Sequence, residues 1–326
     1  MHALARTLSL LAPLVLDGGR DPATALPAST STTSAGSVAG LARIAVLGAS
    51  VSDGFGLDDE IGARTVFADV VDASLKTAHE SVYNKASAFF FSDPAGTARD
   101  AVEAAKKKDP TLVVGIDYLF WFGYGRVPAE SDRLARFEKG LASLESFTCP
   151  VLVGDLPDMS PALEGESPLT HRPMLRREQV PTPESLKKLN ERLAAWSTEH
   201  ANVVVVPLAE MLARVRAHDE IALRGNVWPK DAAPRLLQKD LLHPTLEGAI
   251  AVWLVAGDCL VRARPAYPAD AFEWDAKAIW RKVYDSKADA REARLEKLRK
   301  AKEAKQHEKP SPQPEPDPAK KGEGHG

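Results

Sequence analysis

Two short segments, far apart in the chain, carry residue types that together can perform nucleophilic chemistry. Ser50 lies in the segment GASVSDGFG (48–56), and Asp240 precedes His243 by three positions in DLLHP (240–244). An Asp at this spacing can accept from the imidazole Nδ1–H and leave Nε2 free as a base for a serine hydroxyl. The sequence therefore predicts Ser50 as a nucleophile, His243 as its base and Asp240 as the residue that orients the base.

Each segment also has a simpler interpretation. The glycines around Ser50 are typical of a turn, and the segment contains neither a dinucleotide-binding nor a P-loop glycine pattern. Asp240 can cap a helix that begins near Pro244, with His243 as an ordinary loop residue. Ser52 is the alternative nucleophile if the turn is shifted by two residues.

The residues between positions 41 and 264 alternate between short apolar runs and helical patterns. The runs are rich in β-branched residues and bounded by turn signals, as expected for buried parallel strands. We therefore predict an α/β fold: a three-layer α/β/α sandwich with a flavodoxin-like, doubly wound sheet of about five parallel strands. The predicted strands are Ile44–Leu47, Val82–Tyr83, Leu112–Val114, Val151–Val153 and Val203–Val206, and the clearest helices are Ala95–Lys107, Asp132–Ser146, Pro183–Glu199 and Thr245–Arg262.

This fold would bring Ser50 and His243 to one edge of the sheet. Ligand sites in open parallel sheets lie beyond the carboxyl ends of the strands. Ser50 follows the first predicted strand and His243 follows the last, so both belong to that edge. Their common placement favours the catalytic interpretation over two unrelated turns.

The composition narrows the class of protein. The 326 residues are 44% hydrophobic and 27% charged, with a formal net charge of −3, so the chain lacks the basic excess typical of nucleic-acid-binding proteins. No uncharged apolar run is long enough for a membrane-spanning helix. Cys149 and Cys259 are the only cysteines, which excludes a disulfide-dense scaffold and a cysteine-based zinc site, while a single bridge between them stays open.

Four segments are expected along the chain. Residues 1–40 form a leader, either a weak signal peptide that would export the protein to the periplasm or outside the cell, or a disordered extension of a cytoplasmic protein. Residues 41–264 form the folded domain, and residues 265–285 are a C-terminal extension. Residues 286–326 are a charged, Pro-rich tail without enough apolar residues for a core, in which residues 288–306 favour a solvated helix.

The two segments and their order resemble the GDSL, or SGNH, family of serine hydrolases. The segment from Ile44 to Gly56 is similar to the family's first block, and the one from Asp240 to Pro244 is similar to its last. The resemblance covers about residues 41–264 and implies the SGNH hydrolase fold, ester hydrolysis through an acyl-enzyme on Ser50, and no metal or organic cofactor.

The blocks that supply the family's oxyanion donors differ in this chain. In the first block Ala49 replaces the family's Asp. After the second strand, in the segment NKASAFF (84–90), Ala88 or Phe89 stands where the family has a glycine, and Asn84 is another candidate donor. After the third strand Asp117 replaces the asparagine whose amide donates to the oxyanion, and an ionised carboxylate can only accept.

Three outcomes for this oxyanion site are open. Asp117 could stay protonated among Phe120, Trp121 and Phe122 and donate as a neutral acid. Alternatively, Asn84 or another group could supply the donor, or the site could have lost catalysis. On the first of these interpretations, Asp117→Asn is expected to preserve or raise activity at neutral pH.

Several other residues are weaker candidates for the site. Asp155 and Asp158 follow the fourth strand, where they either touch substrate or cap a loop. The aromatic runs at 89–91 and 118–124 either line a pocket or belong to the core. His171, in the long loop beyond, is a candidate without an assigned role.

The sequence thus favours an esterase, a lipase-like enzyme or a carbohydrate deacylase, acting on a small-molecule or carbohydrate ester. The alternative is a catalytically impaired module of the same fold that binds carbohydrate or a protein partner. A flavodoxin-like nucleotide binder shares the architecture, but the phosphate loop is missing.

Overall fold

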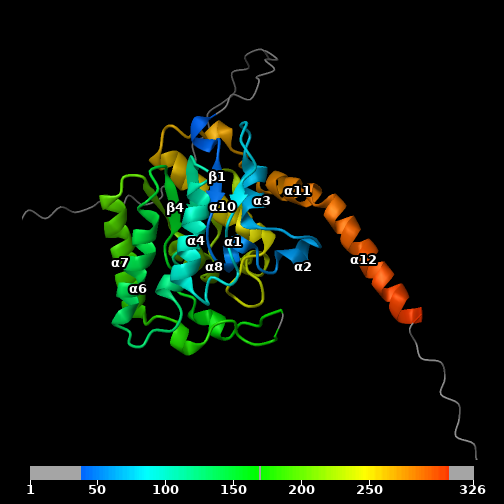
Figure 1. Ribbon diagram of the computed structural model, residues 1–326, viewed down its shortest axis with the longest axis horizontal. Helices are drawn as coiled ribbons and strands as arrows, with labels where there is room; N and C mark the ends of the chain where they lie inside the picture. The colour runs from blue at the N-terminus through cyan, green and yellow to red at the C-terminus, as the bar shows by residue number, and fades with distance from the viewer. Residues whose placement is uncertain (1–37, 169, 308–326) are drawn as a thin grey trace, which may run out of the picture. The chain divides into compact units, whose positions relative to one another are not determined.

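Five short parallel strands form the central sheet of this protein (Figure 1). The structure, a computed structural model, describes residues 38–168 and 170–307. The strand order is β2-β1-β3-β4-β5, which is the flavodoxin-like order of a doubly wound sheet. The predicted fold class is therefore confirmed. The strands are β1 (Ile44–Val46), β2 (Tyr83–Asn84), β3 (Leu112–Gly115), β4 (Val151–Gly154) and β5 (Val203–Val206).

Helices cover both faces of this sheet, because successive side chains of a buried strand point to opposite sides. Ile44 and Val46 belong to one apolar cluster, whereas Ala45 belongs to the other. The first cluster includes residues of α3 (Phe67–Ser74), α10 (Leu246–Ala263) and α11 (Ala276–Ser286). The second includes residues of α4 (Pro94–Lys106), α6 (Asp132–Leu144) and α7 (Pro183–Glu199).

The long helices begin close to the predicted positions because their first turns carry local start signals. Thr182 caps α7, where its hydroxyl accepts from the backbone N–H of Ser185, and Thr245 caps α10 by accepting from Gly248. Asp93 does the same for α4 at Gly96. Such caps satisfy N–H groups that the helix itself leaves free.

Shorter elements fill the connections at the two edges of the sheet. A two-stranded antiparallel hairpin, β6-β7, turns at Arg224 and Gly225, both with positive φ. The remaining elements are α1 (Ser50–Asp53), α2 (Leu57–Ile61), α5 (Phe120–Gly123), α8 (Leu208–Arg216), α9 (Ala233–Leu236), β6 (Ile221–Leu223), β7 (Asn226–Trp228) and the 3₁₀ turns Ala39–Leu41, Ser160–Leu163, Arg177–Gln179 and Ala269–Ala271.

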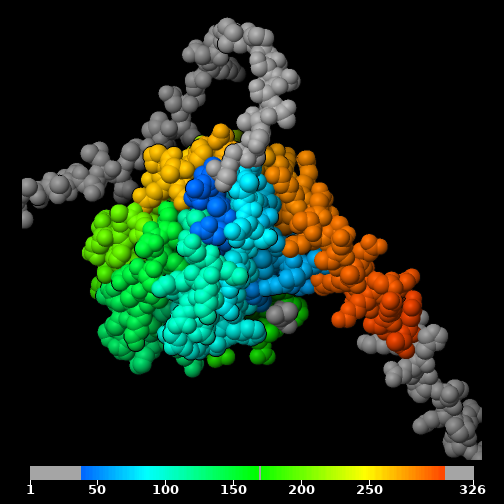
Figure 2. Space-filling model, turned by 45° about the horizontal axis from the view of Figure 1, so that its top comes forward, coloured from blue at the N-terminus to red at the C-terminus, as the bar shows by residue number. Residues whose placement is uncertain are grey.

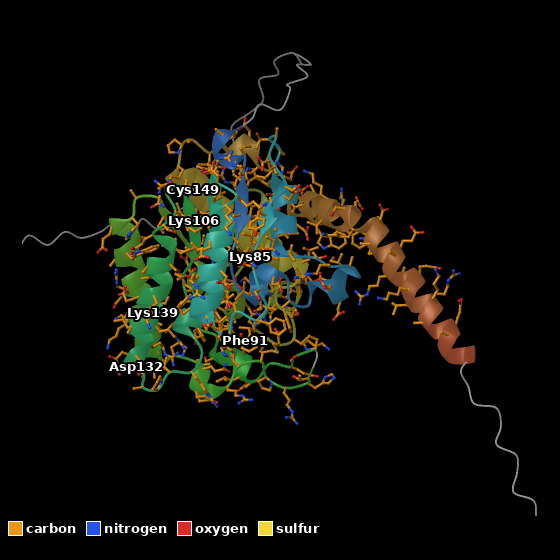
Figure 3. All side chains as sticks on the ribbon, in the orientation of Figure 1. Lys85, Phe91, Lys106, Asp132, Lys139 and Cys149 are labelled. Carbon is orange, nitrogen blue, oxygen red and sulfur yellow. The ribbon has the colours of Figure 1, made fainter. Side chains whose placement is uncertain are left out.

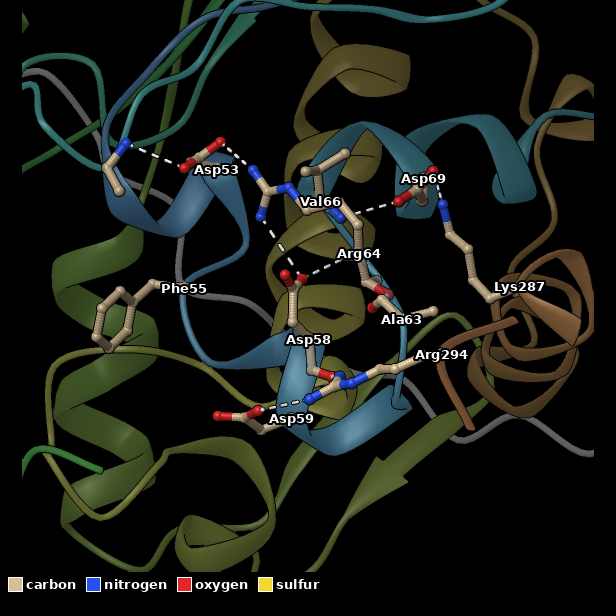
Figure 4. Close-up of polar contacts among 12 residues, drawn as sticks. Asp53, Phe55, Asp58, Asp59, Ala63, Arg64, Val66, Asp69, Lys287 and Arg294 are labelled. Carbon is tan, nitrogen blue, oxygen red and sulfur yellow. Dashed lines mark hydrogen bonds and ion pairs between the residues drawn. The ribbon is translucent and has the colours of Figure 1, made fainter. Parts of the chain in front are cut away.

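The segment 265–285 packs against the domain through α11. Ile279 and Val283 are buried in the same cluster as α3 and α10. The following helix, α12 (Ala288–His307), covers the residues for which the sequence predicts a solvated helix, and most of its surface is open (Figure 2). Arg294 donates to the Asp58 carbonyl of α2, while Lys287 at the end of α11 pairs with Asp69 of α3 (Figure 4). The Lys287–Asp69 pair is partly buried, whereas the ion pair of Arg294 with Asp59 is exposed, and exposed pairs stabilise only weakly.

Several predictions concern residues outside this description. The leader lies outside the described residues up to position 37, as does the tail beyond position 307, so export and the disordered tail stay predictions. Within the described ranges, no helix is both long and apolar enough to span a membrane. Cys149 and Cys259 are both free, so the bridge left open by the sequence is not formed.

Candidate functional site

Ser50 is the first residue of α1, immediately beyond the carboxyl end of β1. Gly48 makes this turn possible, since its φ of 152° is one that L side chains rarely adopt. A Cβ on Gly48 would lie 2.1 Å from Asp117 Oδ1 and 2.4 Å from Ser52 Oγ. The glycine therefore lets the Ser50 turn pack directly against Asp117.

His243 lies between Ser50 and Asp240. Its Nε2 is 2.8 Å from Ser50 Oγ, and its Nδ1 is 2.7 Å from Asp240 Oδ2. Both side chains are buried, Asp240 with 0% and His243 with 1% of its surface exposed, whereas Ser50 is partly exposed. The structure thus brings together the three residues that the two sequence segments predicted.

Local backbone geometry fixes the Asp240 carboxylate. Asp240 Oδ1 accepts from the backbone N–H groups of Leu242 and His243, 3.0 Å from each. Leu241, between Asp240 and Leu242, has a φ of 56°, an uncommon conformation for a residue with a branched side chain. Burial acts to raise the pKa of Asp240, but the bond and charge of His243 and these two N–H groups outweigh it and lower the pKa. Asp240 is therefore held as a carboxylate.

A second set of contacts holds His243 from the other side. The Phe55 ring, with its centroid 4.4 Å from that of the imidazole, packs against His243. Gln238 Nε2 donates to the carbonyls of Phe55 and Pro244, at 2.7 Å in both cases, and so ties the Ser50 side of the site to the His243 side. Gly165 packs closely against the same loop, because a Cβ at this position would lie only 2.0 Å from the Asp240 carbonyl oxygen.

Asp117 is buried on the opposite side of Ser50 and accepts four hydrogen bonds from the α1 turn. Oδ1 accepts from the Ala49 N–H at 3.0 Å and the Ser52 hydroxyl at 2.5 Å, and Oδ2 accepts from the N–H groups of Val51 at 2.8 Å and Ser52 at 3.3 Å. Burial raises the pKa of Asp117, and these four bonds oppose the shift. If the carboxyl is protonated, Ser52 Oγ is the partner placed to receive its proton.

The loop after β2 uses the predicted oxyanion N–H groups in other contacts. The Ala88 N–H donates to Asp53 Oδ2 at 3.1 Å, and Asp53 also pairs with Arg64 (Figure 4). The Phe89 N–H donates to the Ser87 hydroxyl at 3.2 Å. The side-chain oxygen of Asn84 accepts from the backbone N–H of Ala86. The Ala88 and Phe89 N–H groups would each have to exchange a partner to bind a developing oxyanion, whereas the bond at Asn84 uses its oxygen and not its amide nitrogen.

A cavity of about 110 Å³ adjoins Ser50 at the carboxyl edge of the sheet. Figure 3 locates this edge by Phe91, which follows β2, while Cys149, just before β4, marks the opposite edge. The cavity walls are mostly apolar and come from the segments that follow β3 and β4 and from the helices α5, α8 and α10. They include Ile116, Phe120, Leu156, Leu208, Met211, Leu212 and Val252, with Ser50, Asp117 and Asp155 as polar groups.

Of the remaining candidates from the sequence, one lines the cavity and the others do not. Asp155 lines the cavity, whereas Asp158 is exposed and caps the next turn at Ser160. His171 is exposed and pairs with Glu166, with Nδ1 2.6 Å from Oε1. Ser52 is fully buried and donates to Asp117, so it does not share the exposure of Ser50 or its contact with His243.

The two aromatic runs divide between core and surface. Phe90, Tyr118 and Phe122 pack in the second apolar cluster, while Phe89 is 73% exposed. Phe120 is the aromatic residue of these runs that lines the cavity. The cavity walls of α8 and α10 were not predicted, because no local pattern indicates that these helices face Ser50.

The described residues contain no group of three or more His, Cys, Asp or Glu side chains placed to hold a metal ion. No protein-family model matches the chain, and a comparison with curated proteins found no match that reaches significance.

Two solved structures illustrate what the fold is similar to. A crystal structure of TesA matches with a TM-score of 0.40 at 14% identity, over 69% of this chain and 99% of that chain. The lipase/acylhydrolase from Enterococcus faecalis matches with a TM-score of 0.39 at 17% identity, over 68% of this chain and 96% of that chain. Because both TM-scores are low, we base the proposed function on the geometry of the site and not on this likeness.

Proposed function

We propose that this protein is a serine ester hydrolase of the SGNH type, with Ser50 as nucleophile, His243 as general base and Asp240 as the residue that orients the base. The observation that carries the proposal is the continuous contact from Ser50 Oγ through the imidazole to the Asp240 carboxylate. Both distances lie within the range for a nucleophile activated by a base.

Each step of this reaction has a group to perform it. With Nδ1–H donating to Asp240, Nε2 is unprotonated and takes the Ser50 proton as Oγ attacks the ester carbonyl carbon. His243 then gives that proton to the leaving alcohol oxygen as its bond to the carbonyl carbon breaks, leaving an acyl-enzyme on Ser50. A water molecule, deprotonated by His243, attacks the acyl carbon and restores the serine hydroxyl.

The cavity supports an ester with an apolar acyl chain. The leaving alcohol must reach solvent, while the acyl group stays attached to Ser50 during the second half of the reaction. An apolar cavity that adjoins Ser50 can hold that group and remove its surface from water. We infer that the acyl chain enters between α8 and α10.

The oxyanion has one available donor in the α1 turn. The Ser50 backbone N–H, at the start of α1, donates to no acceptor within the described part of the chain. Its neighbours at Ala49, Val51 and Ser52 all donate to Asp117. We propose Ser50 N–H as the first donor, and a rearranged N–H of Ala88 or Phe89 as the second.

Hydrolysis of p-nitrophenyl acyl esters tests this function. The wild-type protein is expected to hydrolyse them, and Ser50→Ala to lose nearly all turnover while keeping its fold by circular dichroism. Ser131→Ala, which changes an exposed serine just before α6, is the matched control and should retain activity. Activity that is unchanged in Ser50→Ala would overturn the proposal.

A second candidate function is a binding module without catalysis, and the contacts around the oxyanion site favour it. Asp117 supplies a carboxyl in place of an amide donor and bonds to Ala49, Val51 and Ser52, and the Ala88 and Phe89 N–H groups already have partners. Losing one oxyanion donor typically costs a factor of ~10²–10³ in rate. This candidate predicts ligand binding without any covalent intermediate on Ser50.

A further inference from the structure

Asp155 places a carboxyl group in the wall of the otherwise apolar cavity. It follows β4 directly, at the edge of the sheet where Ser50 follows β1. Its Oδ1 accepts from the backbone N–H of Ala209 at 2.7 Å, and the Leu208 N–H contributes a further bond. The side chain thus caps the start of α8 from the neighbouring strand.

These contacts leave part of the carboxyl without a partner. A carboxylate can accept about four hydrogen bonds, and α8 supplies two. Among the described residues, no Lys, Arg or His forms an ion pair with Asp155. The nearby charged or titratable groups are Glu210 of α8 and Cys259 of α10, neither of which neutralises it. Burial raises the pKa of Asp155 to about 6.

A plain alkyl chain in this cavity would displace water from the Asp155 carboxyl without replacing the hydrogen bonds that the water donates. A buried acceptor left unsatisfied is costly, so a ligand that supplies a donor gains over one that does not. A hydroxyl can donate to the carboxyl without bringing a second charge into an apolar space. An ammonium would have to lose its own hydration, which is more expensive.

We propose that Asp155 determines specificity by accepting a hydrogen bond from a hydroxyl on the acyl chain, so that the preferred substrates are esters of hydroxy acids. This inference rests on the proposed function, because it assigns the cavity to the acyl group of an ester attacked by Ser50.

Matched substrates that differ only in the donor test this assignment. The set consists of p-nitrophenyl esters of hexanoic acid, of its 3-hydroxy and 6-hydroxy derivatives, and of the methyl ethers of those two acids. A methyl ether keeps the oxygen and removes the donor. For the wild-type protein we expect kcat/KM of at least one hydroxy ester to exceed that of its methyl ether by about tenfold. A ratio near one for both positions would overturn the proposal, as would stronger preference for a 6-aminohexanoate ester.

Asp155→Asn separates recognition from the capping of α8. The asparagine oxygen can still accept from the N–H groups of Ala209 and Leu208, which turns its amide nitrogen toward the cavity. That nitrogen can donate equally well to a hydroxyl oxygen and to an ether oxygen. The tenfold ratio of kcat/KM between hydroxy ester and methyl ether should therefore fall toward one. Asp158→Asn, on the same loop but exposed, is the control and should keep the wild-type ratio. An unchanged ratio in Asp155→Asn would contradict the assignment.

A binding experiment keeps this test independent of catalysis. Methyl ketones with the same hydroxy and methoxy chains are titrated into Ser50→Ala and into Ser50→Ala/Asp155→Asn by calorimetry. Tighter binding of a hydroxy ketone by Ser50→Ala alone supports the role of Asp155 even if no ester is hydrolysed. Equal binding of both ketones by Ser50→Ala contradicts it even if Ser50 proves catalytic.

Discussion

Two buried carboxyl groups flank the Ser50 turn, and their surroundings give them different tasks. Asp240 pairs with the His243 imidazole, and its pKa is lowered. Asp117 has no titratable partner among the described residues and accepts from three backbone N–H groups and one hydroxyl, and its pKa is raised by burial. From this difference we propose that the Asp240 carboxyl serves the chemistry at Ser50, whereas the Asp117 carboxyl holds the shape of the turn.

Removing the nucleophile should have the largest effect. Ser50→Ala is expected to lower kcat for ester hydrolysis by a factor of about 10⁴ or more, because no acyl-enzyme can form. The free energy of unfolding should change little, since Ser50 is partly exposed. Steady-state kinetics and urea unfolding measure the two effects. If Ser50→Ala instead loses much of its stability, activity is lost through unfolding. That result would contradict a chemical role for Ser50 and for Asp240, which acts on Ser50 through His243.

Asp240→Asn tests the chemical carboxyl directly. Asn can donate its amide N–H to Nδ1 and so favours the tautomer that carries a proton on Nε2, which cannot act as a base. We expect kcat to fall by about 10³–10⁴-fold with KM nearly unchanged. Retention of more than a tenth of the activity would show that Asp240 does not orient His243 for catalysis.

Asp117→Asn tests the structural carboxyl, and here the contacts reverse the expectation drawn from the sequence alone. An amide nitrogen would face the N–H groups of Val51 and Ser52 or of Ala49, so donors would meet donors. We expect a loss of about 1–3 kcal/mol in the free energy of unfolding, measured in urea. Activity should fall with it because the Ser50 turn loses its support.

The control for this variant is Asp100→Asn, which changes an exposed carboxyl on α4. It should leave both stability and activity near the wild-type values. If Asp117→Asn is instead as stable as wild type and more active, then Asp117 occupies an oxyanion position, as the sequence suggested, and the contrast between the two carboxyls fails.

An effect of pH on stability is expected at a third carboxyl, that of the partly exposed Asp155. Because the pKa of Asp155 is raised to about 6, the folded state binds a proton more tightly than the unfolded state does. Stability is therefore lost as pH rises from about 4 through about 6, by up to about 3 kcal/mol. Asp155→Asn removes this titration. The melting temperature of the variant should therefore rise relative to that of the wild-type protein as pH increases from about 4 to about 6. A constant difference across these pH values would contradict the raised pKa.

Local signals explain why much of this arrangement was predictable. Most strands are short, largely buried runs rich in β-branched residues, such as Val203–Val206, which alternate with amphipathic helices and imply a parallel sheet. Asp240 and His243 are three residues apart, so their pairing depends on one turn. Ser50 joins them because parallel strands bring their carboxyl ends to one edge.

Long-range packing explains what was not predictable. The bonds from Asp117 to the α1 turn join residues 65 to 68 positions apart, and no local pattern in either segment specifies them. The cavity cannot be predicted locally either, since its walls come from loops and helices spread between Ser50 and Val252. The role proposed for Asp155 depends on that cavity and on its contacts with α8. The sequence alone shows only that Asp155 follows a predicted strand.

The activation of Ser50 is tested most directly by labelling the intact protein with a fluorophosphonate and locating the adduct by mass spectrometry. The geometry predicts one adduct, on Ser50, that is lost in His243→Ala and strongly slowed in Asp240→Asn, while Asp100→Asn labels like wild type. Labelling at another residue, or the absence of labelling in the folded wild-type protein, would contradict an activated serine at this site.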